Sequence, residues 1–239
     1  MIIVTAATSF ETAWISSQLV RPRPVAVGKF TALRGSLGTV PVLVLHSGVG
    51  KTNAAHGATL LLEKFRPALV LLTGCGGAYR NSGMIPGDLA IASEEIFGDE
   101  GVITPQGWRS IKYMKLPLLR KGKQSFYNVF PMDRKVVKKA VKILQGFRPR
   151  TGPFVTVSEV TGTEEKADEM EKRFRGICEN MEGAAVAQIC TLYGVPLLEI
   201  RGISNVVKER NKREWKLSAA ARVSQEAARE IILHWKEIL

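Results

Sequence analysis

The chain has 239 residues, 45% of them hydrophobic, and a formal net charge of +12 at pH 7. This length and apolar content are enough for one sizeable core, and no repeat, low-complexity tract or Pro/Gly/Ser-rich linker divides the chain. We therefore expect a single domain spanning residues 1–239. No apolar run approaches the ~20 residues of a membrane-spanning helix, which argues against a helical membrane protein.

Short β-rich runs alternate with helical patterns along the chain. The expected strands are Ile2–Ala6, Val40–His46, Ala68–Thr73, Asp88–Ser93, Pro153–Val157 and Pro196–Ile203. The expected helices are Ser9–Leu19, Lys51–Lys64, Asp133–Gln145, Glu164–Arg175, Glu182–Tyr193 and Leu217–Leu239. This alternation predicts an α/β fold, a three-layer sandwich with a central mixed β-sheet flanked by helices and with catalytic groups at the strand ends.

The cysteines and the N-terminus indicate a cellular compartment. Cys75, Cys178 and Cys190 are odd in number and lack Cys-x-x-Cys spacing, which favours a reduced cytoplasmic protein. Residues 1–4 begin a strand pattern directly, without the basic region and cleavage site of a signal peptide. We expect a protein that is not exported.

The positive charge raises the possibility of a nucleic-acid partner, because clustered Lys and Arg neutralise phosphates. The densest basic group is Lys135, Lys138, Lys139 and Lys142, and apolar residues alternate with it at helical spacing. This pattern favours the solvated face of an amphipathic helix. We predict no nucleic-acid and no membrane partner.

Two glycine-rich stretches resemble nucleotide-binding motifs. Residues 48–52 suggest a P-loop, but Leu45 stands where that motif needs its first glycine. Residues 74–77 (Gly-Cys-Gly-Gly) follow an apolar strand, so their bare backbone could approach a ligand. They could equally form a tight turn that needs positive φ. Both interpretations stay open from the sequence.

Three stretches carry a resemblance to a known family: Ser47–Lys51, Asn180–Gly183 and Arg201–Asn205, the last after an apolar strand. Together they resemble the nucleoside phosphorylase and nucleosidase superfamily, in particular the hydrolases that cut purine N-glycosidic bonds. The resemblance implies a small-molecule purine nucleoside as substrate, no cofactor and no metal, and a homo-oligomer, either a dimer or larger.

The resemblance also implies roles for Met181, Glu182 and Glu11. Met181 would lie under the sugar and Glu182 would accept hydrogen bonds from the ribose hydroxyls, whereas Glu11 would activate water. A plainer interpretation of Glu11 is a first-turn acid behind an N-cap at Thr8 or Ser9. The two interpretations of Glu11 are compatible.

Asn205 bears on the choice of base, because adenine-cleaving members of the family usually hold an aspartate there. The asparagine amide can donate to N7 and O6 of a 6-oxopurine, and a mismatched buried group costs roughly 1–3 kcal/mol. Asn205 therefore predicts hypoxanthine as the leaving base. Glu159 either accepts a hydrogen bond from N1–H of the 6-oxopurine or is a solvated loop residue. The remaining substrate-binding residues expected from the resemblance are Gly76, Val160 and Ser204.

Water is the predicted nucleophile. Phosphorylases of the superfamily carry arginines after the first strand and before the glycine-rich segment of the third, where this chain has Glu11 and Leu72-Thr73. An acid at the first of these places repels phosphate. Lys51 and Arg80 are cations that could still reach the cleft.

Among the hydrolases, these stretches and residues 99–102 are most similar to the members that cleave futalosine, an intermediate of one menaquinone pathway. The aromatic residues of the region 104–150 would then close the far end of the sugar pocket, often across a subunit contact. They are Trp108, Tyr113, Phe126, Tyr127 and Phe130. Arg80, Arg109 and Lys112 are candidates to bind the substrate carboxylate.

Other functions remain open at this stage. Within the fold, the alternative is a nucleosidase for methylthioadenosine, S-adenosylhomocysteine or inosine-type substrates. From another class, a basic nucleic-acid- or purine-binding protein could keep the fold without turnover. Glu11 and Glu182 argue against that last class, because a binder needs no pair of carboxylates.

Overall fold

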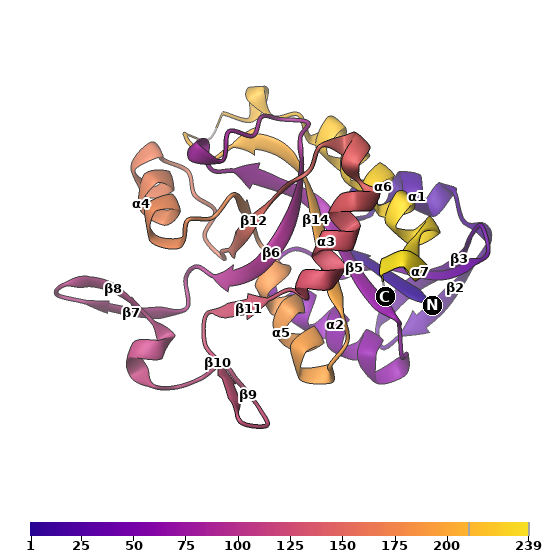
Figure 1. Ribbon diagram of the computed structural model, residues 1–239, viewed down its shortest axis with the longest axis horizontal. Helices are drawn as coiled ribbons and strands as arrows, with labels where there is room; N and C mark the ends of the chain where they lie inside the picture. Colours follow the sequence, from indigo (N-terminus) through magenta and orange to yellow (C-terminus); the bar gives the residue numbers. More distant parts are fainter. Residues whose placement is uncertain (210, 239) are drawn as a thin grey trace.

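The computed structural model describes residues 1–209 and 211–238. Ten strands of this part form one mixed sheet in the order β11-β6-β12-β13-β5-β1-β4-β3-β2, with β14 paired to both β5 and β6 (Figure 1). Their bounds are β1 (Ile2–Ala6), β2 (Val20–Val27), β3 (Phe30–Leu37), β4 (Val40–His46), β5 (Leu69–Ala78), β6 (Leu89–Phe97), β11 (Val129–Pro131), β12 (Arg150–Thr156), β13 (Cys178–Asn180) and β14 (Leu197–Val206).

The centre of the sheet is parallel and buried. β1 runs parallel to β4 and β5, and β14 runs parallel to β5. All five residues of β1 are buried, as expected for a strand covered on both faces. The pairings β6–β12–β13–β5–β14–β6 return to their starting strand and so close a ring of five strands.

Helices cover both faces of the sheet. They are α1 (Ala13–Ser17), α2 (Lys51–Lys64), α3 (Arg134–Ile143), α4 (Glu164–Phe174), α5 (Gly183–Tyr193), α6 (Leu217–Leu233) and α7 (Trp235–Ile238). α2 packs against α5, while α6 packs on β14 and β5 and contacts α1 and α3. The predicted α/β sandwich is confirmed. No helix of the described chain is long and apolar enough to cross a membrane.

Most predicted elements are present, with shifted ends. Strands β1 and β4 and helix α2 have the predicted bounds. The predicted helix Ser9–Leu19 is instead a 3-10 turn, Ser9–Glu11, followed by the short α1. The predicted helix Leu217–Leu239 is divided into α6 and α7, and its last residue, Leu239, lies outside the described residues.

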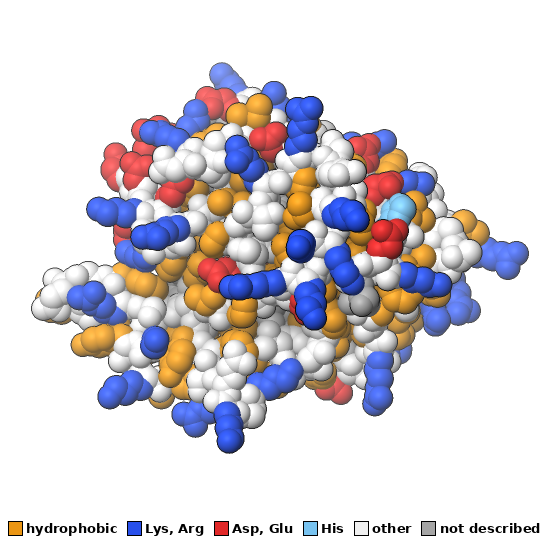
Figure 2. All heavy atoms as spheres, in the orientation of Figure 1, with side chains coloured by type: hydrophobic (Ala, Val, Ile, Leu, Met, Phe, Trp, Pro, Cys, Tyr) orange, Lys and Arg blue, Asp and Glu red, His pale blue; other side chains and the backbone are white. Residues whose placement is uncertain are grey.

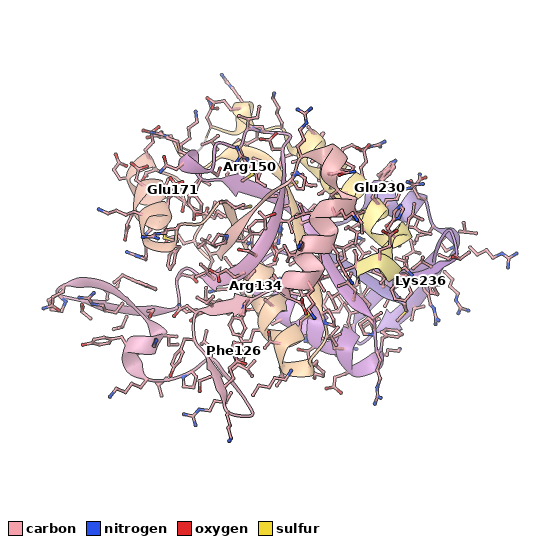
Figure 3. The ribbon with its side chains drawn as sticks, in the orientation of Figure 1. Phe126, Arg134, Arg150, Glu171, Glu230 and Lys236 are labelled. Atoms are coloured by element: carbon pink, nitrogen blue, oxygen red, sulfur yellow. The ribbon has the colours of Figure 1, made fainter. Side chains whose placement is uncertain are left out.

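Two hairpin arms project from the body of the molecule (Figure 1). β7 (Gly101–Thr104) pairs with β8 (Gly107–Ser110), and β9 (Leu119–Lys121) pairs with β10 (Gln124–Phe126). Figure 3 shows Phe126 where the second arm joins the body. There Phe126 stacks on Phe130, which packs edge-on against Phe97.

The basic residues are dispersed. Figure 2 shows Lys and Arg side chains spread over the visible face, with uncharged and acidic residues between them. On α3, Lys135, Lys138 and Lys139 are exposed, whereas Val136 and Val137 are buried. Asp133 caps this helix by accepting from the N–H groups of its first turn. The prediction of a solvated helix face is confirmed.

Candidate active site

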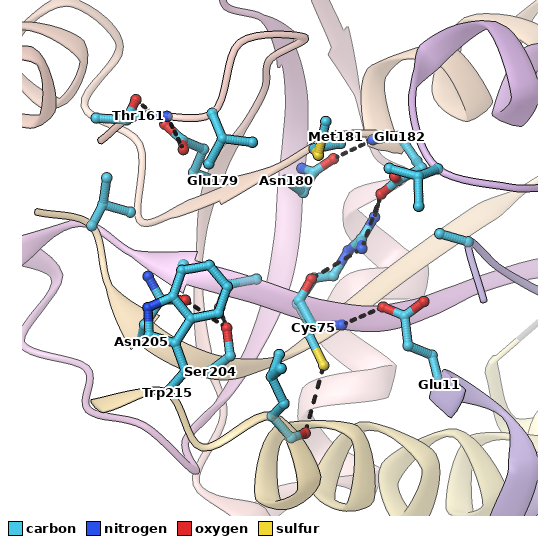
Figure 4. Close-up of a pocket in the computed structure, with 18 of the residues that line it drawn as sticks. Glu11, Cys75, Thr161, Glu179, Asn180, Met181, Glu182, Ser204, Asn205 and Trp215 are labelled. Carbon is cyan, nitrogen blue, oxygen red and sulfur yellow. Dashed lines mark hydrogen bonds and ion pairs between the residues drawn. The ribbon is translucent and has the colours of Figure 1, made fainter. Parts of the chain in front are cut away.

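A cavity of about 340 Å³ opens beyond the ends of β1, β12 and β13 and over the last residues of β5 and β14 (Figure 4). Its volume lies within the ~300–1,000 Å³ range typical of small-molecule sites. Seven of the eight site residues predicted from the sequence line it: Glu11, Gly76, Val160, Met181, Glu182, Ser204 and Asn205. Glu159 does not.

Glu11 both ends the turn after β1 and faces the cavity. Its Oε2 accepts from the N–H and the hydroxyl of Thr8, each at 3.0 Å. Its Oε1 accepts from the N–H of Cys75 at 2.9 Å. Three donors therefore fix both carboxylate oxygens, so the first-turn acid of the sequence analysis is present and the same side chain also reaches the cavity. The side chain is 8% exposed, on the cavity wall.

Glu182 stands at the N-terminus of α5, 4% exposed. The N–H of Gly50 donates to its Oε1 at 3.0 Å, so the glycine-rich stretch 48–52 supports a carboxylate rather than a phosphate. Both terminal nitrogens of Arg201 lie 3.4 Å from its Oε2. Asn180 orients the backbone here, because its Oδ1 accepts from the N–H groups of Glu182 and Gly183.

Arg201 is a buried cation that the sequence analysis assigned no role. Its Nε donates to Glu199 at 2.9 Å and its Nη1 to the carbonyl of Cys75 at 3.1 Å. A Cβ on Gly74 would lie 2.6 Å from Glu11 Oε1 and 2.9 Å from Arg201 Nη1, so the missing side chain lets both approach. The guanidinium thus lies between Glu11 and Glu182. In the sequence, the signal for the ion pair of Arg201 with Glu199 is an Arg and a Glu two positions apart in an apolar strand.

A second pair of acids lies behind Glu182. Glu95 and Glu199 are both fully buried, and their pKa values are raised, first because burial disfavours the charged form. A Cβ on Gly183 would lie 2.0 Å from Glu95 Oε1 and 2.5 Å from Glu199 Oε2, so both carboxyl groups converge under this glycine. Glu95 also accepts from Thr156 at 2.6 Å. The pKa of Glu95 lies well above 4.5, and we infer that this pair retains one proton.

Ser204 and Asn205 lie at the end of β14. Ser204 Oγ lies 2.7 Å from Asn205 Oδ1, and the amide nitrogen of Asn205 donates to the carbonyl of Val206 at 3.1 Å. This arrangement fixes the amide orientation with its oxygen toward Ser204. The second amide hydrogen of Asn205 is left for a ligand.

The structure favours one of the two interpretations of Glu159, the solvated loop residue. Glu159 is exposed, and the preceding Ser158 is tied through its N–H to Asp99 at 2.7 Å. Glu179 lines the cavity instead, 6% exposed on β13. Burial raises the pKa of Glu179, although hydrogen bonds from Thr161 and Tyr79 oppose that rise. Sequence analysis missed this residue because its strand is only three residues long.

The stretch 74–77 is neither a turn nor a positive-φ segment, because it continues β5 and none of its glycines has positive φ. Its glycines are required for close approach. A Cβ on Gly76 would lie 2.4 Å from the sulfur of Cys178. Cys75 lines the cavity, but burial raises the pKa of its thiol to about 12, so the thiol is not ionised near neutral pH.

The cations suggested by the sequence do not line this cavity. Lys51 pairs with Asp99 at 2.7 Å, and Arg80 pairs with Glu164 at 2.7 Å. Arg109 lies in β8 and Lys112 in the 3-10 turn that follows it, and both are outside the cavity lining. Lys208 does line it, and its Nζ lies 2.7 Å from Glu214.

The aromatic residues of the insertion also differ from expectation. None of them lines the cavity within this chain. Trp108 packs edge-on against Phe174, and Phe126 and Phe130 belong to the core. Within one chain these residues do not close the cavity, and the expectation that they do so across a subunit contact stays a prediction. Described aromatic residues that do line it are Phe10 and Trp215.

Comparison with known proteins agrees with this geometry. Residues 1–239 match the family described as the phosphorylase superfamily. A 5'-methylthioadenosine/S-adenosylhomocysteine nucleosidase of Geobacillus thermodenitrificans is 30% identical over 93% of this chain and 92% of its own. The chain belongs to the phosphorylase superfamily, within its nucleosidases. The futalosine hydrolase of Thermus thermophilus is 31% identical over 85% of this chain and 86% of its own.

Solved structures of the superfamily share the fold. The nucleosidase of Neisseria meningitidis in complex with methylthio-immucillin-A has a TM-score of 0.83, 23% identity and 97% coverage of both chains. A futalosine hydrolase mutant of Helicobacter pylori has a TM-score of 0.84, 20% identity and 98% coverage of both chains. At these identities the likeness concerns the fold, and it does not distinguish between the two named activities.

Proposed function

We propose that this protein hydrolyses futalosine to hypoxanthine and dehypoxanthine futalosine, as a step of menaquinone biosynthesis in the cytoplasm. One observation carries the proposal: Glu11 and Glu182 face a single cavity in which the base-reading residue, Asn205, is an amide. The carboxylates support hydrolysis of a nucleoside, and the amide supports a 6-oxopurine as the leaving base.

In the proposed reaction, Glu11 takes a proton from water while the water oxygen bonds to the anomeric carbon. The bond from that carbon to the base nitrogen breaks, and its electron pair leaves with the purine, which then gains a proton. Glu182 accepts from the ribose hydroxyls and opposes the positive charge that develops on the sugar. Water and these side chains suffice, so the proposal needs no cofactor and no metal.

The charge of the cavity favours water over phosphate as nucleophile. Four acids, Glu11, Glu179, Glu182 and Glu209, line the described cavity, against the two cations Arg201 and Lys208. Arg201 is already paired with Glu182 and Glu199. A phosphate dianion would enter a site in which the acids exceed the cations, and this is electrostatically unfavourable.

Asn205 supports hypoxanthine as the product. Its oxygen is held toward Ser204, so the amide presents N–H to the base. This hydrogen bond to N7 and O6 stabilises the negative charge that the base gains as the bond breaks. An ionised aspartate in its place would put a carboxylate oxygen against O6 of the purine, and both of these oxygens are hydrogen-bond acceptors.

The far end of the substrate is a carboxyphenyl group. The cavity lining includes the cation Lys208 and the apolar side chains of Phe10 and Leu217. We propose Lys208 as the partner of the substrate carboxylate, in place of Arg80, Arg109 and Lys112. It would have to exchange Glu214 for the substrate, and because that pair is solvent-exposed the exchange costs little.

We also propose that the protein is a homo-oligomer, a dimer or larger. Ile103 on the first projecting arm is 85% exposed, and Tyr113 and Leu116, in the segment that joins the two arms, are 65% and 61% exposed. Apolar residues this exposed on an extended arm are typical of a subunit contact. A second copy would bring such an arm over a neighbouring surface.

The second candidate is a methylthioadenosine/S-adenosylhomocysteine nucleosidase, favoured by the name of the Geobacillus relative. The test is incubation with futalosine, inosine and methylthioadenosine in phosphate-free buffer, with the free base followed by chromatography. We expect hypoxanthine from futalosine, at a rate that added phosphate leaves unchanged. Faster release of adenine from methylthioadenosine would replace the proposed substrate, and a sugar 1-phosphate would identify a phosphorylase.

A further inference from the structure

Arg201 lies between two acids and is bound unequally by them. Its Nε donates to Glu199 Oε1 at 2.9 Å, whereas both of its terminal nitrogens stay 3.4 Å from Glu182 Oε2. A guanidinium that pairs freely with a carboxylate approaches to about 2.7–2.9 Å and often makes two parallel hydrogen bonds. Arg201 is only 1% exposed, so solvent screens its attraction to Glu182 weakly. The long contact with Glu182 therefore needs a cause.

Glu199 provides that cause. It stands two positions before Arg201 on β14, so the two side chains project from the same face of the strand. Its carboxylate draws the guanidinium back along this strand, and the carbonyl of Cys75 holds Nη1 at 3.1 Å. Glu199 thus competes with Glu182 for one cation.

Glu95 supports the charge of Glu199. No N–H or hydroxyl group of the described chain donates to Glu199 Oε2, although this oxygen is buried. Glu95 Oε1 converges on the same oxygen under Gly183. Burial raises the pKa of both carboxyl groups; at Glu95 the charge of Glu199 raises it further, whereas at Glu199 the charge of Arg201 opposes the rise. The proton therefore stays on Glu95, which donates to Glu199.

Neither acid of this pair lines the described cavity. Glu95 is held in place by Asn180, whose Nδ2 donates to Oε1 at 2.7 Å, and by the hydroxyl of Thr156 at 2.6 Å. The pair can act on a substrate only through Arg201, because that residue does line the cavity. Its role is one of positioning.

Glu182 is the residue on which this positioning acts. Its Oε1 accepts from the N–H of Gly50 at 3.0 Å. In the proposed function Glu182 also accepts from the ribose hydroxyls. A carboxylate has about four acceptor positions, and a guanidinium bound closely at Oε2 would occupy those that the hydroxyls need.

We propose that Glu199, supported by Glu95, is a positioning residue that holds Arg201 back from Glu182 and so keeps Oε2 of Glu182 open to the ribose hydroxyls. This inference rests on the proposed function for the contact between Glu182 and the sugar. It does not depend on which base is released.

The first test compares two ligands that differ in one ribose hydroxyl, formycin B and 2'-deoxyformycin B. Both are C-nucleosides, in which a carbon–carbon bond joins the base to the sugar, so hydrolysis does not interfere. Calorimetry at pH 7 gives the ratio of their dissociation constants. The wild type should bind the ribose form about 10- to 100-fold more tightly, as expected for a hydroxyl that donates to a carboxylate.

The variant is Glu199→Gln, in which a neutral amide holds Arg201 more weakly. The guanidinium should then move onto Glu182, and the preference for the ribose form should fall about 10-fold. Glu94→Gln is the matched control and should keep the wild-type ratio, because Glu94 is partly exposed on β6 and lies outside the cavity lining. A general loosening of the structure would weaken both ligands equally, so an unchanged ratio in Glu199→Gln would overturn the inference.

Infrared spectroscopy tests the support from Glu95. A protonated carboxyl group has its own carbonyl band, and the frequency of this band depends on the group that accepts the proton. We expect such a band at pH 7 in the wild type and a shifted band in Glu199→Gln, where an amide replaces the accepting carboxylate. A spectrum that the substitution leaves unchanged would contradict the proposal. A wild type without any such band would contradict it too, even if the variant did not fold.

Failure of the proposed function gives a different pattern. If futalosine is not hydrolysed but the ribose preference falls in Glu199→Gln, the assignment of futalosine fails and the role of Glu199 stands. If futalosine is hydrolysed and the preference does not change, the role of Glu199 fails alone. Equal binding of both ligands by the wild type would remove the contact between Glu182 and the 2'-hydroxyl, and the inference with it.

Discussion

The buried pair of Glu95 and Glu199 makes a quantitative prediction about stability and pH. If Glu95 keeps its proton in the folded state, the folded protein binds one more proton than the unfolded chain at every pH between the two pKa values. The unfolded value is about 4.5, and the folded one is raised well above it by burial, by the charge of Glu199 and by their shared hydrogen bond. The free energy of unfolding must then decrease as the pH rises through this window.

The size of the effect follows from linkage. Wherever the folded protein retains a proton on Glu95 that the unfolded chain has lost, linkage lowers the free energy of unfolding by about 1.4 kcal/mol for each pH unit. Glu95 makes its full contribution to stability at pH values below its pKa in the unfolded chain. This contribution is lost as the pH rises through its pKa in the folded protein. Glu95→Gln is neutral in both states and lacks this dependence. The wild type should therefore lose stability relative to Glu95→Gln as the pH rises.

The assay is urea unfolding of both proteins at pH 5.5, 6.5 and 7.5. In the difference between the unfolding free energies of wild type and Glu95→Gln, groups that titrate alike in both proteins cancel. The slope of this difference against pH reports the proton on Glu95, because a change in hydrogen bonding alone would shift the difference equally at every pH. Glu94→Gln, on the same strand but partly exposed, is the control and should run parallel to the wild type. Parallel curves for Glu95→Gln would refute the reasoning, because Glu95 would then be ionised beside Glu199.

Further predictions concern the cavity. Glu11→Gln should bind substrate nearly normally and lose about 10²–10⁴-fold in kcat, the usual contribution of a general base, and single-turnover kinetics would test this. Glu182→Gln should raise KM and lower kcat together; an unchanged KM would remove its contact with the ribose. Asn205→Asp should lower the ratio of 6-oxo to 6-amino cleavage about 10- to 100-fold, with residual activity rising toward acid pH as the carboxyl is protonated. Lys208→Met should raise KM for futalosine but not for inosine, which has no carboxylate; equal changes would place the carboxylate elsewhere.

Much of the fold could be predicted from the sequence because its central strands are buried on both faces. β1 and β4 read as short continuous apolar runs, and their bounds were predicted correctly. The strands β2 and β3 were missed because they form an outer hairpin of mostly exposed or half-exposed residues, including Arg and Pro, with no apolar face to detect. The pairing that closes the five-strand ring joins β14 to β6, which lie about a hundred positions apart. No local pattern in the sequence indicates a contact between strands so far apart.

Contacts between residues far apart in the sequence also account for the parts of the site that the sequence analysis missed. Glu11, Glu182 and Asn205 each follow or end a strand, and the resemblance to a known family pointed to them. Glu95 and Glu199 converge only because Gly183 leaves room for both, and that depends on the position of a helix.

Glu159 and Glu179 show how much the lining of the cavity depends on a single strand. Sequence analysis left Glu159 as either a contact of the base or a solvated loop residue, and it follows β12 into an exposed loop. Glu179 belongs to β13, whose three residues pair antiparallel with β5 while β12 runs parallel to β13. That pairing sets Glu179 beside Gly77, across from Asn205. The place of Glu179 in the cavity wall thus depends on the register of a three-residue strand, and moving this register by one residue would turn its side chain to the other face of the sheet.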